Sequence, residues 1–192
     1  MNVTLHPRFA KIISTVGSPV LLFPVVISIL FVHKLGLAQA SPMVITVCAV
    51  FGALSVFLLI RKIRGSITNL DVSDQKQRAV NVYLPIMVLL LVAVGYFYLT
   101  DQPFVGETLF VGALLGVCFA TNAVIKISMH TVVATYLGTI IVPISPWAGL
   151  AFLLFSGLIA WSRVVLDRHT QEEVLIGWGV GLVFGIMHAY WF

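Results

Sequence analysis

Long, uninterrupted apolar runs fill most of this chain and limit how it can fold. Most runs approach the ~20 residues that a helix needs to cross the ~30 Å hydrocarbon core of a bilayer. Their apolar residues are continuous, whereas strands of a transmembrane barrel alternate apolar and polar residues. Because a helix satisfies its own backbone hydrogen bonds in lipid, the runs predict membrane-spanning helices. They cover residues 16–34, 43–60, 82–99, 104–122, 131–145, 147–161 and 174–191.

The number of spans depends on the fifth and sixth runs, which are short. Each could cross the bilayer as a tilted helix, or the two could form a re-entrant pair joined through Pro143, Ser145 and Pro146. Seven spans are the first expectation and six the alternative. Few residues remain outside the runs, so we predict an all-α, polytopic transmembrane helix bundle that forms a single integral membrane domain over residues 1–192.

Composition excludes other classes of protein. Hydrophobic residues make up 60% of the chain and charged residues only 9%, whereas soluble domains carry about 25% charged residues. A soluble enzyme and a disordered chain are therefore excluded. The net charge of +4 does not indicate a nucleic-acid partner, because membrane proteins gather Lys and Arg at one membrane face. Cys48 and Cys118 lie inside apolar runs, and nothing around them indicates a disulfide or a metal site.

The charges also predict an orientation. Of the 11 Lys and Arg residues, all but Lys34 lie in the N-terminal segment or in connections on the same side of the membrane. This bias persists when the cations of the candidate site are left out. The positive-inside rule places that side in the cytoplasm. We expect a multi-pass protein of a bacterial inner (plasma) membrane, with its polar connections on the cytoplasmic face.

Nearly all the reactive side chains lie in three segments, residues 71–78, 126–130 and 162–173. Two predicted spans separate each segment from the next, so all three reach the same membrane surface. This topology allows them to form one site.

The third segment is the most informative. His169 and Glu173 are four residues apart, so they share one face of a helix. A carboxylate on one ring nitrogen fixes the histidine tautomer and leaves the other nitrogen to act as a nucleophile or base. Arg163 and Arg168 supply planar donors that suit phosphate oxygens. If Thr170 begins the last helix, the helix N-terminus also favours an anion nearby.

The other two segments add an acid and further donors. His130 is a candidate general acid for a leaving alkoxide, and Ser128 and Lys126 lie on the same short connection. Arg78 and Lys76 come from the first segment. Two histidines, an orienting carboxylate and several cations suit phosphoryl transfer through a phosphohistidine. This chemistry requires no metal, because fixed cations can neutralise the phosphate.

These residues resemble the signature of the type 2 phosphatidic acid phosphatase superfamily, whose parts read K-x(6)-R-P, P-S-G-H and S-R-x(5)-H-x(3)-D. In the third part, Ser162-Arg163 is followed after five residues by His169 and after three more by Glu173, which replaces Asp. The second part reads Ile127-Ser128-Met129-His130 and matches at Ser and His.

The first part of the signature matches least. Arg78 stands at the Arg position, Ala79 replaces Pro, and Asp71 occupies the Lys position. Lys76 or Lys126 could supply the missing cation.

The resemblance implies a helical-bundle hydrolase of phosphoric monoesters or diphosphates that needs neither a metal nor a cofactor. Its substrate would be a lipid phosphate or a prenyl (di)phosphate, bound among membrane lipids. By this resemblance, His169 is the nucleophile, Glu173 orients it, and His130 is the acid. The phosphate-binding residues would be Arg78, Arg163 and Ser128, with Lys76 or Lys126.

Other classes of function remain open. Asp71 and Asp74 could hold Mg²⁺ in a membrane prenyl or phosphatidyl transferase, with Asp167, Glu172 and Glu173 as a second acidic cluster. A non-enzymatic small transporter or a haem-binding subunit is a further alternative. A transporter would more typically place charges in mid-membrane, where these runs have almost none.

Overall fold

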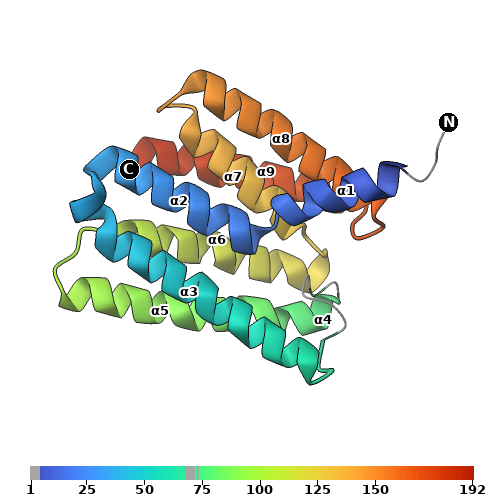
Figure 1. The fold of residues 1–192 in the computed structure, drawn as a ribbon, viewed down its shortest axis with the longest axis horizontal. Helices are drawn as coiled ribbons and strands as arrows, with labels where there is room; N and C mark the ends of the chain where they lie inside the picture. The colour runs from blue at the N-terminus through green and yellow to red at the C-terminus, as the bar shows by residue number, and fades with distance from the viewer. Residues whose placement is uncertain (1–4, 68–71, 73) are drawn as a thin grey trace. The chain divides into compact units, whose positions relative to one another are not determined.

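The computed structural model describes residues 5–67, 72 and 74–192, and within these ranges it is all-α (Figure 1). This confirms the predicted fold class. The helices are α1 (Leu5–Val16), α2 (Pro19–Leu35), α3 (Leu37–Ile63), α4 (Gln75–Arg78), the π-helical turn η1 (Ala79–Tyr83), α5 (Leu84–Leu99), α6 (Val105–Val124), α7 (Met129–Ile141), α8 (Pro146–Val165) and α9 (Gln171–Trp191).

A helix occupies each of the predicted apolar runs, as expected for an integral multi-pass membrane protein. Within the described ranges, five helices are long and apolar enough to cross a membrane, or six if α1 and α2 form one bent span. The five are α3, the continuous helix Gln75–Leu99, α6, α8 and α9.

The helix α7 is too short to span the bilayer upright. Its 13 residues rise about 20 Å at 1.5 Å per residue, less than the ~30 Å hydrocarbon core. Every residue from His130 to Ile140 is buried, and α7 packs against both α8 and α9. The length criterion therefore leaves α7 out of the five or six spanning helices of the described ranges, although α8, the other half of the re-entrant pair considered above, meets it alone. The chain still runs along α7 and returns along α8, because the segment before α7 contacts Glu173 just after the turn that follows α8.

The N-terminal segment differs from the predicted span over residues 16–34. Two helices, Pro7–Val16 and Pro19–Leu35, meet at an angle of 45°. Proline is favoured in the first turn of a helix, and here Pro19 starts α2. Exposed Arg8 and Lys11 alternate with buried Ala10 and Ser14 along α1. The sequence prediction missed α1 because its few apolar residues do not form a continuous run.

The helices divide into two compact units, Met1–Ile27 with Ile125–Phe192 and Ser28–Val124. In the first unit, α7 packs along α8 and α9, and α1 packs on α8. In the second unit, α5 packs on α6 and α3, around a core that contains Met43, Phe97 and Phe104.

Small residues allow α7 and α9 to approach closely. Gly177, Gly181 and Gly185 follow one another at one-turn spacing on α9. A Cβ atom at Gly181 would lie 2.4 Å from the carbonyl oxygen of Val132, and one at Gly185 would lie 2.5 Å from Cβ of Thr139. Small residues at this spacing are a common means of packing helices in membranes. These three glycines therefore allow the beginning of α9 to lie beside the beginning of α7.

Candidate functional site

The turn between α8 and α9 holds Arg163 and His169 close together. The carbonyl oxygen of Arg163 accepts hydrogen bonds from the backbone N–H groups of Arg168, at 3.0 Å, and His169, at 3.3 Å. The N–H of Asp167 donates to the carbonyl of Val164 over 3.0 Å, and Asp167 adopts a left-handed conformation with φ 50°. This Schellman-type arrangement gives a physical reason for the six-residue step from Arg163 to His169.

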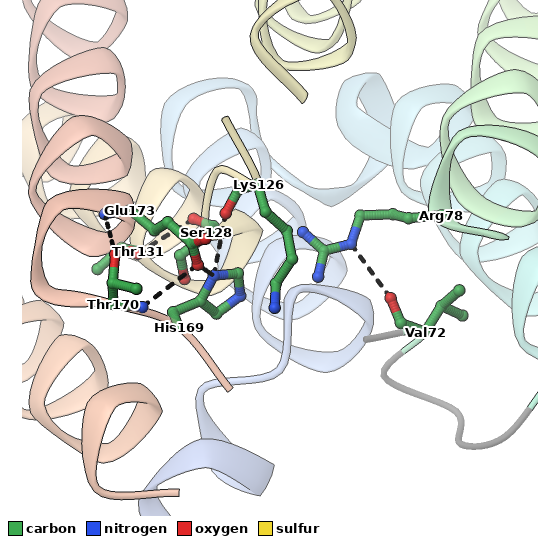
Figure 2. Close-up of polar contacts among 8 residues, drawn as sticks. All are labelled: Val72, Arg78, Lys126, Ser128, Thr131, His169, Thr170 and Glu173. Carbon is green, nitrogen blue, oxygen red and sulfur yellow. Dashed lines mark hydrogen bonds and ion pairs between the residues drawn. The ribbon is translucent and has the colours of Figure 1, made fainter. Parts of the chain in front are cut away.

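The imidazole of His169 contacts two acceptors through the same ring nitrogen (Figure 2). Its Nδ1 lies 2.7 Å from Oε2 of Glu173 and 3.0 Å from the carbonyl oxygen of Lys126. Since the Lys126 carbonyl can only accept, Nδ1 must carry the proton. In the neutral ring the lone pair is then on Nε2, as a nucleophile requires.

The carboxylate of Glu173 also caps α9. Thr170 is the N-cap residue, and its Oγ1 accepts the N–H of Glu173 over 3.2 Å. In return, Oε2 of Glu173 accepts the N–H of Thr170 over 3.3 Å. This capping box confirms that Thr170 begins the last helix. His169 therefore lies before α9, and it does not share a helix face with Glu173 as the spacing predicted. The carboxylate oxygen that contacts His169 is therefore held by the backbone as well.

The segment before α7 contacts the beginning of α9 through Ser128. The backbone N–H of Ser128 donates to the carbonyl oxygen of Glu173 over 3.3 Å, and the hydroxyl of Thr131 donates to the carbonyl of Ser128 over 3.1 Å. The Ser128 side chain is fully buried, and its Oγ has no hydrogen-bond partner within the described part of the chain. Buried hydroxyls without a partner are uncommon in folded proteins, and a bound ligand is one way to satisfy them.

His130 lies two residues beyond Ser128, in the first turn of α7, and is 6% exposed. The Ser128–Glu173 contact joins the beginnings of α7 and α9. The two predicted histidines therefore lie at adjoining helix ends within one unit.

Arg163 is almost completely buried, at 2% exposure, near the end of α8. Its Nη1 donates a hydrogen bond to Oγ of Ser14 on α1 over 2.6 Å. Ser14 was not predicted as a site residue, because a single serine in an amphipathic segment belongs to no motif. A weak signal was present in the small residues Ala10, Ser14 and Gly17, which recur on one helix face.

The three other predicted phosphate-binding cations are divided between the two units. Lys126 is half-buried in the first unit, and in Figure 2 its ammonium group lies on the side of the imidazole away from Glu173. Arg78 and Lys76 lie in the second unit, on α4. Arg78 is buried and donates from Nε to the carbonyl of Val72 over 3.2 Å, whereas Lys76 is exposed.

The acidic residues considered as metal ligands have other positions. Oδ1 of Asp74 accepts the N–H of Gln77 over 2.7 Å and caps α4, while Asp71 lies outside the described residues. Asp167 and Glu172 are exposed. In the described ranges, no three His, Cys, Asp or Glu side chains gather as potential metal ligands.

The first unit thus contains an oriented imidazole, a second histidine, a buried guanidinium, a buried hydroxyl and the N-terminus of α9. Donors and positive charge of this kind favour an anion, and an imidazole with a fixed tautomer can act as a nucleophile.

Comparisons of the chain with protein-family models, curated protein sequences and solved structures gave no match. The chemistry of the site is therefore the basis on which a function can be proposed.

Proposed function

We propose that this protein is a membrane phosphatase that removes phosphate from a lipid phosphate or a prenyl (di)phosphate through a phosphohistidine. The observation that carries the proposal is the position of His169 Nδ1 between Glu173 Oε2 and the Lys126 carbonyl. The resemblance of residues 162–173 to the third signature of type 2 phosphatidic acid phosphatases supports the same assignment.

In the first step, Nε2 of His169 attacks the phosphorus atom. A bond forms between Nε2 and phosphorus, and the bond from phosphorus to the lipid oxygen breaks. His130 donates a proton to the leaving oxygen, so that a lipid alcohol departs rather than an alkoxide. For a diphosphate, the leaving group is the prenyl monophosphate. Glu173 stabilises the positive charge that develops on the imidazole.

In the second step, water attacks the phosphorus atom of phosphorylated His169. His130, now neutral, takes a proton from the water as the bond between Nε2 and phosphorus breaks. Inorganic phosphate leaves, and both histidines return to their original protonation states. One water molecule is consumed for each ester or phosphoanhydride bond cleaved.

Charge on the phosphoryl oxygens is stabilised in this proposal by residues of the first unit. Arg163 supplies a buried guanidinium, and Ser128 supplies a hydroxyl whose oxygen lacks a partner in the described structure. Lys126 and the N-terminus of α9 add positive charge. Fixed donors at a buried site stabilise a transition state strongly, because they need no reorganisation. Phosphate binding by Arg78 and Lys76 stays a prediction from the sequence.

A lipid substrate follows from the place of the site at the end of apolar helices. The head group would bind at the polar ends of α7 and α9, and the acyl or prenyl tail would lie among the membrane lipids. We propose a bacterial plasma membrane as the location of the protein. The distribution of its cations supports a site on the cytoplasmic face.

The test is phosphate release by the purified protein from phosphatidic acid, phosphatidylglycerol phosphate, polyprenyl phosphates and polyprenyl diphosphates. We expect activity with at least one of these lipids, and we expect His169→Ala to abolish it. The matched control is His33→Ala, because His33 is exposed near the end of α2. Undiminished phosphate release by a folded His169→Ala variant would contradict the mechanism.

Two further measurements separate the proposal from a transferase. The phosphatase should keep its activity in EDTA, whereas a Mg²⁺-dependent prenyl or phosphatidyl transferase should lose it. Brief reaction with substrate labelled in the transferred phosphate should leave an acid-labile label on the wild type and none on His169→Ala.

A further inference from the structure

The contact between Ser14 and Arg163 joins residues 149 positions apart in the chain. Both side chains are buried, and Nη1 of Arg163 donates to Oγ of Ser14 over 2.6 Å. A guanidinium is planar and rigid. Holding one terminal nitrogen therefore restricts the orientation of the whole group.

Packing alone does not require a hydroxyl at position 14. The buried face of α1 also contains Ala10, and Gly17 follows in step just beyond the helix. A Cβ atom at Gly17 would lie 2.5 Å from Cδ1 of Ile159, so small residues are needed where this face meets α8. Alanine would satisfy that need at position 14. Serine differs from alanine by the oxygen that accepts from Arg163.

The opposite face of α1 suits a position at the membrane surface. Arg8 and Lys11 are exposed, and so are the apolar side chains of Phe9 and Ile12. A helix with this mixture of cations and apolar residues is typical of the lipid–water interface, where anionic head groups are bound. Ser14 thus lies on an element that would meet the lipid head groups.

We propose that Ser14 is a positioning residue of the phosphate site, because its hydroxyl orients the Arg163 guanidinium. This inference rests on the proposed phosphatase function. Ser14 does not contact the phosphate in this scheme. It acts by keeping Arg163 in the one orientation that receives the phosphoryl oxygens.

The test compares Ser14→Ala and Ser14→Thr with the wild type in lipid phosphate hydrolysis. We expect Ser14→Ala to lower kcat/KM about tenfold, as for loss of one hydrogen bond to a charged group, mainly through a higher KM. Inhibition by orthovanadate should weaken to a similar extent. Ser14→Thr, which keeps the hydroxyl, should restore much of both. The matched control is Thr15→Ala, because the exposed Thr15 hydroxyl donates within its own helix to the carbonyl of Lys11 over 2.9 Å.

A double-mutant cycle distinguishes positioning from general stability. In an Arg163→Lys background the planar group is absent, so Ser14→Ala should no longer affect calorimetric binding of orthovanadate. An equal loss in both backgrounds would overturn the inference, as would an unchanged KM in Ser14→Ala. If Ser14→Ala does not fold, Ser14→Cys tests the same hydrogen bond.

Different results would overturn the phosphatase function and the positioning role of Ser14. A folded wild-type protein that neither releases phosphate nor binds orthovanadate would overturn the phosphatase function and the role of Ser14 with it. An active wild type whose Ser14→Ala and Ser14→Cys variants match it would overturn the role of Ser14 alone.

Discussion

Nδ1 of His169 lies 2.7 Å from Oε2 of Glu173, four residues later in the chain. The same carboxylate oxygen accepts the backbone N–H of Thr170. One side chain therefore closes the N-terminus of α9 and fixes the histidine tautomer. Any change at Glu173 should act on both helix stability and catalysis, and variants can separate the two.

Replacing Glu173 by Gln should impair catalysis more than folding. The amide can still cap the helix, but it has lost the charge that stabilises a positive imidazole, and its NH₂ group can turn toward Nδ1. We expect kcat to fall about 10²- to 10⁴-fold, the range in which an oriented acid–base group contributes. The measurement is steady-state phosphate release, with the unfolding temperature followed in parallel. Glu172→Gln, at an exposed neighbouring position, should change kcat little, and equal losses in the two variants would contradict the role of Glu173.

Replacing Thr170 by Ala should impair folding more than catalysis. The substitution removes the side-chain acceptor for the N–H of Glu173. Loss of an N-cap costs about 1 kcal/mol, within a range of 0.5–2 kcal/mol. We expect the free energy of unfolding in detergent to fall by about that amount. Thr170→Ser should restore it, and an unchanged unfolding transition in Thr170→Ala would refute the capping role.

Replacing Ser128 by Ala should lower activity without lowering stability, the reverse of the effect expected for Thr170→Ala. Within the described structure, the Ser128 hydroxyl is buried without a partner, so its removal costs no hydrogen bond in the free protein. We expect equal or slightly higher stability. We also expect kcat/KM to fall about 10- to 100-fold, because a hydrogen bond to the phosphate is lost.

The control for this prediction is Ser162→Ala. The Ser162 hydroxyl is also buried, but it donates to the carbonyl of Ile159 in its own helix over 2.7 Å. Its removal should therefore leave kcat/KM nearly unchanged. A Ser128→Ala variant with wild-type KM and kcat would show that this hydroxyl does not bind the substrate.

Adding a methyl group at Gly177 should disturb the site through the backbone. A Cβ atom there would lie 2.9 Å from the carbonyl oxygen of Ser128, so α9 and the segment before α7 would have to separate. Overpacking typically costs about 1–3 kcal/mol, and we expect Gly177→Ala to lower both the free energy of unfolding and kcat.

Gly179 provides the comparison on the same helix, because an added Cβ atom meets nothing within 4 Å in the described structure. Gly179→Ala should be neutral or slightly stabilising, since alanine favours a helix over glycine. The two variants can be compared by thermal unfolding and by phosphate release. A neutral Gly177→Ala would mean that the contact between α7 and α9 is more tolerant than its geometry implies.

The comparison of sequence and structure is most instructive at the helix ends. Apolar runs predicted helices at the correct places because an unpaired backbone is not tolerated in lipid. They predicted the N-terminal helix poorly, because α1 is amphipathic and its boundary at Pro19 depends on local backbone geometry. The length of α7 also escaped prediction, since its apolar run was expected over residues 131–145 although the helix ends at Ile141.

The sequence by itself determined the helical class and the membrane character, because hydropathy acts over a few turns. It also predicted that His169 and Glu173 meet, but for a different reason. His169 lies before the N-cap residue Thr170, outside α9, and the contact is made by the carboxylate that caps the helix rather than across a shared helix face. Only the tertiary structure decided that the Lys126 carbonyl shares Nδ1, that Ser14 holds Arg163, and that Ser128 meets Glu173. These contacts involve backbone groups or common hydroxyls on segments far apart in the chain. No residue pattern encodes them, because they form only when small residues let the helices pack closely enough for such groups to meet.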